Sequence, residues 1–229
     1  AFGNNLKAYY DHYRINGYAE GRVATGSTEL QNPTTVYNGV DYKLVYDYNY
    51  YINKYPDIKA AFNGDENATL RHFVECGMNE GRQGKASFNV AAYRANYADL
   101  RSAFGRNLKA YYMHYIGSGY REGRKATGNG VLKNPVTVYN GVDYSLVYDY
   151  NYYISKYSDL KAAFYGDDTA ALRHFVECGM NEGRQAKDSF NVKKYKNRYN
   201  DLQNAFGNDL KSYYMHYIGS GYKEGRKGN

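Results

Sequence analysis

The chain repeats itself, and this repetition constrains its fold more than any other feature. Shifting the 229-residue sequence by 102 residues superposes residues 1–102 on residues 103–204 without a gap. Roughly 70 in every 100 of these positions are identical, and residues 205–229 begin a third copy. A sequence with such a period folds as an array of similar units, so we expect a repeat protein rather than one closed domain.

A shorter period lies inside the long one. The motif Tyr-x-Asp-Leu/Ile-x2-Ala-Phe begins at Tyr55, Tyr97, Tyr157 and Tyr199, in steps of 42, 60 and 42 residues. The basic unit is therefore about 42 residues, and every second junction carries about 18 more. The predicted segments are a partial repeat at 1–26, straps at 27–46 and 129–148, and repeats at 47–87, 88–128, 149–189 and 190–229.

The first complete repeat opens with a helical pattern. Asp47 can cap a helix, because its carboxylate can accept a free backbone N–H of the first turn. Tyr48, Tyr51, Ile52 and Tyr55 follow at the i, i+3, i+4 and i+7 positions of one face. This spacing predicts a short amphipathic helix packed through tyrosine.

Two more helices are expected in the same repeat. Pro56 suits the first position of the second helix, where its missing N–H costs nothing. Asp65 can cap the third, which places Leu70 and Phe73 inward, and Gly77 is expected to end it in the left-handed conformation. About 40 residues have too little core to be stable alone, so the predicted fold class is all-α: a tandem array of stacked three-helix repeats.

The extra residues between repeat pairs have a different pattern. They read NPTTVYNGVDYKLVYD and NPVTVYNGVDYSLVYD, with Asn38-Gly39 and Asn140-Gly141 between β-prone residues. Asn-Gly in this setting is the strongest short-range signal for a hairpin. We therefore predict a short β-hairpin-like strap that ties one pair of repeats to the next.

Each of the five histidines begins the motif H-x4-G-x2-E-G-R, which we call the histidine box. We interpret it as a structural clasp, because an arginine returning after a sharp glycine turn suits a carboxylate at the start of the second helix. The predicted clasp residues are His12, His72, His114, His174, His216, Glu80, Arg82, Glu122, Arg124, Glu182, Arg184, Asp57, Asp99, Asp159 and Asp201.

Other roles for the box have weaker support. One histidine per repeat, with no second at i+3 or i+4, cannot hold a transition metal without ligands from elsewhere. The acidic loops at 63–67 and 165–169 lack the ligand spacing of an EF-hand. Catalytic sites are asymmetric, whereas these charged residues recur in the same local setting, and no catalytic motif is visible. We expect no enzymatic activity, no cofactor and no metal.

Tyrosine is the residue type on which binding could depend. The chain has 31 Tyr, 9 Phe and no Trp, and tyrosine suits half-buried positions and wet interfaces. Tyrosines that the scaffold pattern leaves unexplained lie opposite a helix core face, in the box loop or in the strap. Exposed tyrosine near lysine and arginine is typical of sugar stacking and of protein hot spots. The candidate ligand-binding residues are Tyr50, Tyr152, Tyr18, Tyr120, Tyr222, Tyr42 and Tyr144.

Net charge limits the kinds of binding partner that we expect, and the remaining composition bears on disulfides and membrane insertion. A net charge of +7 is compatible with a solvated surface or with a preference for anionic polymers, while dispersed basic residues without a recognition motif argue against nucleic acid. Cys76 and Cys178 occupy equivalent repeat positions, so we do not expect them to pair. No apolar run long enough to enter a membrane and no signal peptide is visible, and the chain begins inside a repeat, as a fragment would.

Two adjacent segments resemble tandem accessory repeats of secreted and cell-surface proteins of Gram-positive gut anaerobes. They read VYDYNYYINKYPDIKAAFNGD…LRHFVECGMNEGRQG and FNVAAYRANYADLRSAFGRNLKAYYMHYIGSGYREGR. The resemblance covers nearly the whole chain and implies an exported, non-catalytic role. It leaves three alternatives: a module that binds bacterial cell-wall polymer or glycan, a module that binds a host protein such as immunoglobulin, or a spacer. Choline-binding repeats differ, because they use tryptophan cages.

Overall fold

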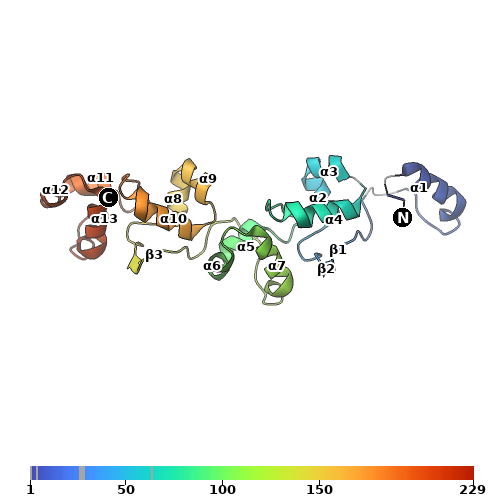
Figure 1. The fold of residues 1–229 in the computed structure, drawn as a ribbon, viewed down its shortest axis with the longest axis horizontal. Helices are drawn as coiled ribbons and strands as arrows, with labels where there is room; N and C mark the ends of the chain where they lie inside the picture. The colour runs from blue at the N-terminus through green and yellow to red at the C-terminus, as the bar shows by residue number, and fades with distance from the viewer. Residues whose placement is uncertain (1, 4, 26–28, 63) are drawn as a thin grey trace. The chain divides into compact units, whose positions relative to one another are not determined.

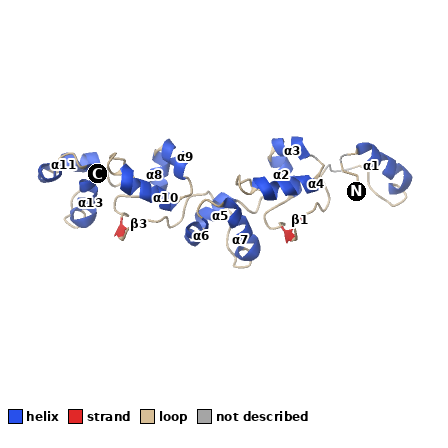
Figure 2. Cartoon of the chain, in the orientation of Figure 1, coloured by secondary structure: helices blue, strands red, loops and turns tan. Residues whose placement is uncertain are grey.

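The computed structural model describes residues 2–3, 5–25, 29–62 and 64–229 (Figure 1). Each complete repeat contains three α-helices of seven residues, and the third continues into a π-helical turn. The predicted all-α repeat array with short straps is confirmed, and helices and loops account for nearly all of the chain drawn in Figure 2.

The element order follows the repeat period. The partial repeat has α1 (Leu6–His12) and η1 (Tyr13–Gly17). The repeat 47–87 has α2 (Tyr48–Lys54), α3 (Pro56–Phe62), α4 (Glu66–His72) and η2 (Phe73–Gly77). The repeat 88–128 has α5 (Val90–Asn96), α6 (Ala98–Phe104), α7 (Leu108–His114) and η3 (Tyr115–Gly119). The repeat 149–189 has α8 (Tyr150–Lys156), α9 (Ser158–Phe164), α10 (Asp168–His174) and η4 (Phe175–Gly179). The repeat 190–229 has α11 (Val192–Arg198), α12 (Asn200–Phe206), α13 (Leu210–His216) and η5 (Tyr217–Gly221).

The described chain forms two compact units. One comprises residues 1–93 and 107–127, and the other comprises residues 94–106 and 128–229. The boundary passes through the repeat 88–128, whose helix α6 belongs to the second unit.

The helix starts follow the capping residues in the sequence. The Asp47 carboxylate accepts the backbone N–H of Tyr50 at 2.8 Å, and the Asp65 carboxylate accepts that of Ala68 at 2.9 Å. Each aspartate satisfies a donor that the first helical turn leaves without an intrahelical partner. Both predicted caps are confirmed.

The straps contain the predicted hairpins. Strands β1 (Val36–Tyr37) and β2 (Val40–Asp41) pair antiparallel, with Tyr37 opposite Val40. The turn residues Asn38 and Gly39 have φ values of 48° and 77°, the left-handed pair that a type I′ turn requires. Strands β3 (Val138–Tyr139) and β4 (Val142–Asp143) repeat this arrangement 102 residues later.

In the second unit the strap is anchored by a buried arginine. The Arg101 side chain of α6 lies 3.2 Å from an Asp168 carboxylate oxygen at the start of α10, and both side chains are almost fully buried. The same guanidinium donates to the backbone carbonyls of Lys133 at 2.8 Å and Asn134 at 3.2 Å. The strap is thus held between two successive repeats, as the sequence predicts.

The core is built mainly from tyrosine, which explains why a chain with mean hydropathy of −0.81 can fold. Many of the buried phenols form hydrogen bonds with nearby groups: the Tyr48 hydroxyl accepts the N–H of Gly64 at 2.9 Å, and Tyr112 donates to the carbonyl of Arg82 at 2.8 Å. Neighbouring rings pack edge to face or tilted, as between Phe88 and Tyr112 at 5.0 Å. The largest fully buried side chains are Tyr46, Tyr48, Tyr51, Tyr93, Tyr111, Tyr112, Tyr148, Tyr150, Tyr153, Tyr195, Tyr213 and Tyr214.

The expectation for Gly77 was wrong. Gly77 is not in the left-handed region; it lies inside the π-helical turn η2, where a Cβ would meet the Tyr51 hydroxyl at 2.6 Å. Glycine is needed there because a buried phenol approaches the backbone. The sharp turn comes four residues later, at Gly81, whose φ is +73°.

Candidate functional site

The box histidines face the interior of their repeats. In all four complete repeats, the histidine Nδ1 lies within hydrogen-bonding distance of a buried tyrosine hydroxyl of the first helix. The pairs are Tyr51–His72 at 3.3 Å, Tyr93–His114 at 2.9 Å, Tyr153–His174 at 3.2 Å and Tyr195–His216 at 2.9 Å. Each bond joins the first helix of a repeat to its third, which is a structural role.

In three of the complete repeats, the box arginine connects the end of the repeat to its second helix. Arg82 donates to the Asp57 carboxylate at 2.7 Å and to Glu80 at 2.5 Å, and its guanidinium lies 5.0 Å from the centre of the Tyr55 ring. The hydrogen bond from Arg82 holds the pKa of Asp57 below its ordinary value. The carboxylate and the aromatic face together fix the planar guanidinium.

The repeats 149–189 and 190–229 show the same network. Arg184 contacts Asp159 and Glu182, and Arg226 contacts Asp201. Arg124 bonds Glu122 at 2.6 Å, and Asp99 occupies the equivalent position in the first turn of α6. In the partial repeat, the His12 ring lies 5.4 Å from that of Phe2. Among the residues that the structure describes, no cluster of three or more His, Cys, Asp or Glu side chains could hold a metal ion, and Cys76 and Cys178 are free thiols.

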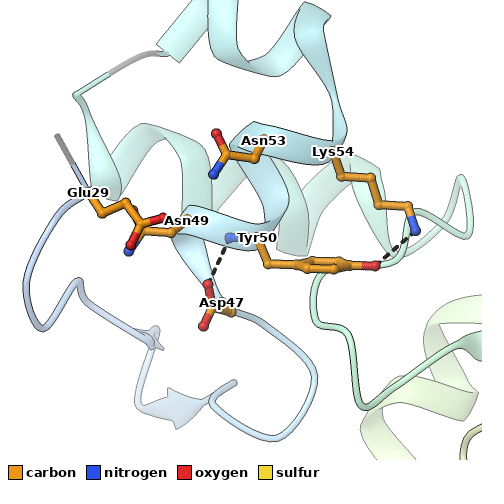
Figure 3. A pocket seen from close by; sticks show the side chains of 6 residues that line it. All are labelled: Glu29, Asp47, Asn49, Tyr50, Asn53 and Lys54. Atoms are coloured by element: carbon orange, nitrogen blue, oxygen red, sulfur yellow. Dashed lines mark hydrogen bonds between the residues drawn. The ribbon is translucent and has the colours of Figure 1, made fainter. Parts of the chain in front are cut away.

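A hollow lies beside helix α2 and contains one of the candidate tyrosines. It has a volume of about 590 Å³ and is lined by Glu29, Asp47, Asn49, Tyr50, Asn53 and Lys54 (Figure 3). Tyr50 is half-buried on the helix face opposite the core, as the sequence predicted from its position relative to Tyr48. The strap lies against this part of α2, since the Asn49 side chain forms two hydrogen bonds with the backbone of the strap residue Leu30, at 3.0 and 3.1 Å.

A lysine is held at the edge of the Tyr50 ring. The Lys54 ammonium donates to the Tyr50 hydroxyl at 2.9 Å and to the Gln83 carbonyl oxygen at 2.6 Å, and it lies 5.2 Å from the ring centre (Figure 3). Two hydrogen bonds fix a side chain that is otherwise flexible. The hollow therefore combines an aromatic surface, a positioned positive charge and several amide and carboxylate groups.

The second unit has an equivalent hollow beside helix α8. Its volume is about 440 Å³, and Tyr152, Asn151 and Leu132 occupy the positions of Tyr50, Asn49 and Leu30. Lys156 again donates to the tyrosine hydroxyl, at 2.8 Å, and to Gln185, also at 2.8 Å, but the lysine that lines this hollow is Lys161. A hollow with the same tyrosine and asparagine, beside the same tyrosine–lysine contact, therefore occurs twice, 102 residues apart.

The two hollows differ at their rims. Val131 stands where the first hollow has Glu29, and Ser155 stands where it has Asn53. The second hollow also contains Tyr165, whose side chain is 51% exposed. It is consequently more apolar and offers two aromatic rings.

The remaining candidate tyrosines fall into two groups. Tyr18, Tyr120 and Tyr222 in the box loops are exposed, at 78%, 59% and 56%. Tyr42 and Tyr144 of the straps are only 4% exposed, so their expected availability to a ligand was wrong. The hairpin folds these two rings inward, and burial raises the pKa of both hydroxyls.

Several residues of the hollows were missed from the sequence. Glu29 comes from a strap and Tyr165 from a loop, and only the folded chain brings them beside Tyr50 or Tyr152; Asn49 is the immediate neighbour of Tyr50. One signal was present: Asn49 and Asn151 recur immediately before the candidate tyrosines in both copies.

No family model, curated protein or solved structure matches this chain, so the site is interpreted from its own geometry. In the part of the chain that the structure describes, no helix has both the length and the apolar character needed to cross a bilayer.

Proposed function

We propose that the chain is a non-catalytic binding module of a secreted or cell-surface bacterial protein, and that it binds cell-wall polymer or glycan. One observation carries the proposal: a half-buried tyrosine with a hydrogen-bonded lysine at its edge recurs, at Tyr50–Lys54 and Tyr152–Lys156, and each of the two tyrosines lines a hollow. Sugar rings pack their C–H faces on aromatic side chains, while amides and charged groups bind their hydroxyls and acidic substituents.

The charge of the chain supports an anionic ligand. The net charge is +7, and Lys54 and Lys156 are presented beside the aromatic surface where a carboxylate or phosphate of a polymer could lie. Each hollow is shallow and would bind weakly alone. Two sites on one chain facing a repetitive polymer gain affinity from effective concentration rather than from a deep pocket.

The test is co-sedimentation of the 229-residue chain with purified cell-wall sacculi at low and high salt. We expect binding at low salt, weakened as salt screens the lysines. The variant carrying Tyr50→Ser and Tyr152→Ser should bind at least tenfold more weakly with an unchanged circular dichroism spectrum. Tyr222→Ser, at an exposed tyrosine outside both hollows, is the matched control. If the chain stays in the supernatant with sacculi from several Gram-positive species, the proposal fails.

A second candidate function is binding of a host protein, with immunoglobulin the named partner. It is favoured by the exposed Tyr18, Tyr120 and Tyr222, each of which stacks edge to face on a tyrosine of its box turn, as Tyr120 does on Tyr115 at 5.9 Å. Exposed tyrosines are common among the residues that contribute most of the binding energy in protein–protein interfaces. Surface plasmon resonance against polyclonal IgA and IgG tests it, with Tyr120→Ser and Tyr222→Ser expected to weaken binding. Blank results in this assay and with sacculi would leave the spacer role.

A further inference from the structure

The hollow beside helix α8 contains a lysine that the hollow beside α2 lacks. Lys161 of α9 lines it, and in the described chain its ammonium takes part in no hydrogen bond or ion pair. Lys59 stands at the equivalent sequence position in the first copy but does not line the hollow there. Lys54 and Lys156, by contrast, are each held by a tyrosine hydroxyl and a glutamine side chain. Lys161 is therefore a positive charge that a ligand in the second hollow could neutralise.

Two tyrosine rings line the same hollow. Tyr152 lies on α8 and is half-buried, whereas Tyr165 directly follows α9 and is 51% exposed. The Tyr165 hydroxyl oxygen would be 3.4 Å from a Cβ at Gly130, so this ring extends to the strap backbone. In the sequence of the first copy, Asn63 stands where the second has Tyr165, and Tyr50 is the aromatic residue that lines the first hollow. The second hollow thus offers a sugar ring an additional aromatic surface.

The strap gives this hollow an apolar rim. Val131 is 50% exposed there, and the buried Leu132 and Ile154 also line the hollow. Glu29 occupies the position of Val131 in the first hollow, whereas no acidic residue of the described chain lines the second. An apolar rim suits a small apolar group such as the methyl of an N-acetyl substituent, and a carboxylate rim would repel an acidic ligand. The exchange of Glu29 for Val131 therefore favours a ligand that is both acylated and acidic.

We propose that the hollow beside α8 binds an N-acetylated sugar that carries a carboxylate. The sugar ring packs on Tyr152 and Tyr165. The acetyl methyl contacts Val131, and the carboxylate pairs with Lys161. This assignment rests on the proposed function, since it names the ligand class of one of the two hollows. Two sources supply this chemistry: N-acetylmuramic acid of bacterial walls and N-acetylneuraminic acid of host glycans.

Titration of the 229-residue chain with monosaccharides, followed by nuclear magnetic resonance, tests the ligand class. N-acetylmuramic acid and N-acetylglucosamine are a matched pair, because they differ only in the lactyl group that carries the carboxylate. We expect the acid to bind about threefold to fivefold more tightly, which is the range of a solvent-exposed ion pair. Glucuronic acid has a carboxylate but no N-acetyl group and should bind no more tightly than N-acetylglucosamine. Equal affinities for the matched pair would overturn the assignment.

Variants of the chain test which residues select the acid. Lys161→Gln should remove the preference for N-acetylmuramic acid and leave the affinity for N-acetylglucosamine unchanged. Lys59→Gln is the matched control, because it changes the equivalent exposed lysine of the other copy and should alter neither affinity. Val131→Glu introduces the residue of the first hollow and should weaken the binding of the acid about fivefold. Equal effects of Lys161→Gln and Lys59→Gln would show that Lys161 does not bind the carboxylate and would overturn the assignment.

Co-sedimentation with sacculi separates this assignment from the proposed function. Sacculi that bind the chain, together with equal affinities for the matched sugars, would keep the proposed function and reject the acidic, acylated ligand. Binding of N-acetylneuraminic acid, without binding of N-acetylmuramic acid or of sacculi, would keep the ligand chemistry and reject the cell-wall source. Binding of N-acetylmuramic acid and of sacculi, both weakened by Lys161→Gln, is the result that we expect.

Discussion

The contact between a buried tyrosine and a box glycine gives the sharpest prediction about the scaffold. A Cβ at Gly179 would lie 2.5 Å from the Tyr153 hydroxyl oxygen and 3.3 Å from a carbon of the Phe175 ring. Gly179 has an ordinary helical backbone, so Gly179→Ala introduces a collision without backbone strain. We expect the Tyr153 hydroxyl to move away from His174, to which it is now bonded at 3.2 Å.

The magnitude follows from three contributions. Overpacking a buried site costs about 1–3 kcal/mol, and a lost hydrogen bond costs about 1 kcal/mol. Replacing glycine by alanine in a helical conformation returns about 0.4–1 kcal/mol. Gly179→Ala should therefore lower the free energy of unfolding by about 1–4 kcal/mol, and each kcal/mol should lower Tm by about 2–4 °C in a chain of this size.

Tyr153→Phe should rescue the alanine variant. Without the hydroxyl, the nearest atom of that ring to the new Cβ is Cζ at 3.5 Å, an ordinary contact. Tyr153→Phe alone should cost about 1 kcal/mol for the lost bond to His174. The double variant should be no less stable than Tyr153→Phe, which makes the two losses strongly sub-additive.

Urea unfolding followed by circular dichroism at 222 nm measures all three variants. The matched control is Gly219→Ala, in the π-helical turn η5, where an added Cβ meets nothing within 4 Å and stability should be unchanged or slightly raised. Additive losses for Gly179→Ala and Tyr153→Phe would refute the claim that the box glycine exists to admit the tyrosine hydroxyl.

Four further predictions follow from the same contacts. Tyr46→Phe and Tyr148→Phe should leave stability unchanged or raise it by about 1 kcal/mol, since these buried hydroxyls have no hydrogen-bond partner in the described chain; Tyr112→Phe should instead lower it by about 1 kcal/mol in the same urea series. Arg101→Gln should lower stability by about 3–5 kcal/mol, because it leaves the buried Asp168 carboxylate unpaired, and a loss no larger than that of Gln203→Ala would contradict this. In acid, the hydrogen bonds from Arg82, Arg184 and Arg226 lower the pKa of Asp57, Asp159 and Asp201, respectively. The stability that these three pairs contribute is complete above the unfolded-state pKa of about 4 and is lost as pH falls below it, so a urea midpoint that stays constant from pH 7 to pH 3 would count against the network. In alkali, burial raises the pKa of the core tyrosines, so the stability that they contribute is complete below about pH 10 and is lost as pH rises further. Absorbance at 295 nm should therefore show these tyrosines ionising late and cooperatively, together with unfolding: Tyr46, Tyr51, Tyr112, Tyr148, Tyr153 and Tyr214.

The features that sequence reasoning predicted well are local. The caps Asp47 and Asp65, the Asn38-Gly39 turn and the sharp glycine turn before Arg82 each depend on a few neighbouring residues and on backbone geometry. The three-helix period follows from apolar spacing. Local rules were sufficient for these positions because no distant contact opposes them.

The errors concern contacts between residues far apart in sequence. Gly77 looked like a helix stop because the Tyr51 hydroxyl that requires glycine there lies 26 residues earlier in the chain. Tyr42 and Tyr144 looked exposed because the strap seemed a surface loop, yet its hairpin turns both rings inward. Arg101 and Asp168 are 67 residues apart, and neither position recurs with the same residue in the other copy, so repetition gave no hint of the pair.

The division between shared and variable residues bears on how the two hollows would recognise ligands. Tyr50–Lys54 and Tyr152–Lys156 are identical and equally oriented, so this pair accounts for whatever the two sites bind in common. Their rims differ in charge and polarity, with Glu29 replaced by Val131 and Asn53 by Ser155. A carboxylate at one rim disfavours an acidic substituent that an apolar rim tolerates, so the second hollow should accept the more acidic portions of a polymer. Under the proposed function, specificity would therefore vary from site to site through the rim residues, while the boxes, whose histidine–tyrosine contacts recur in all four complete repeats, keep the scaffold constant.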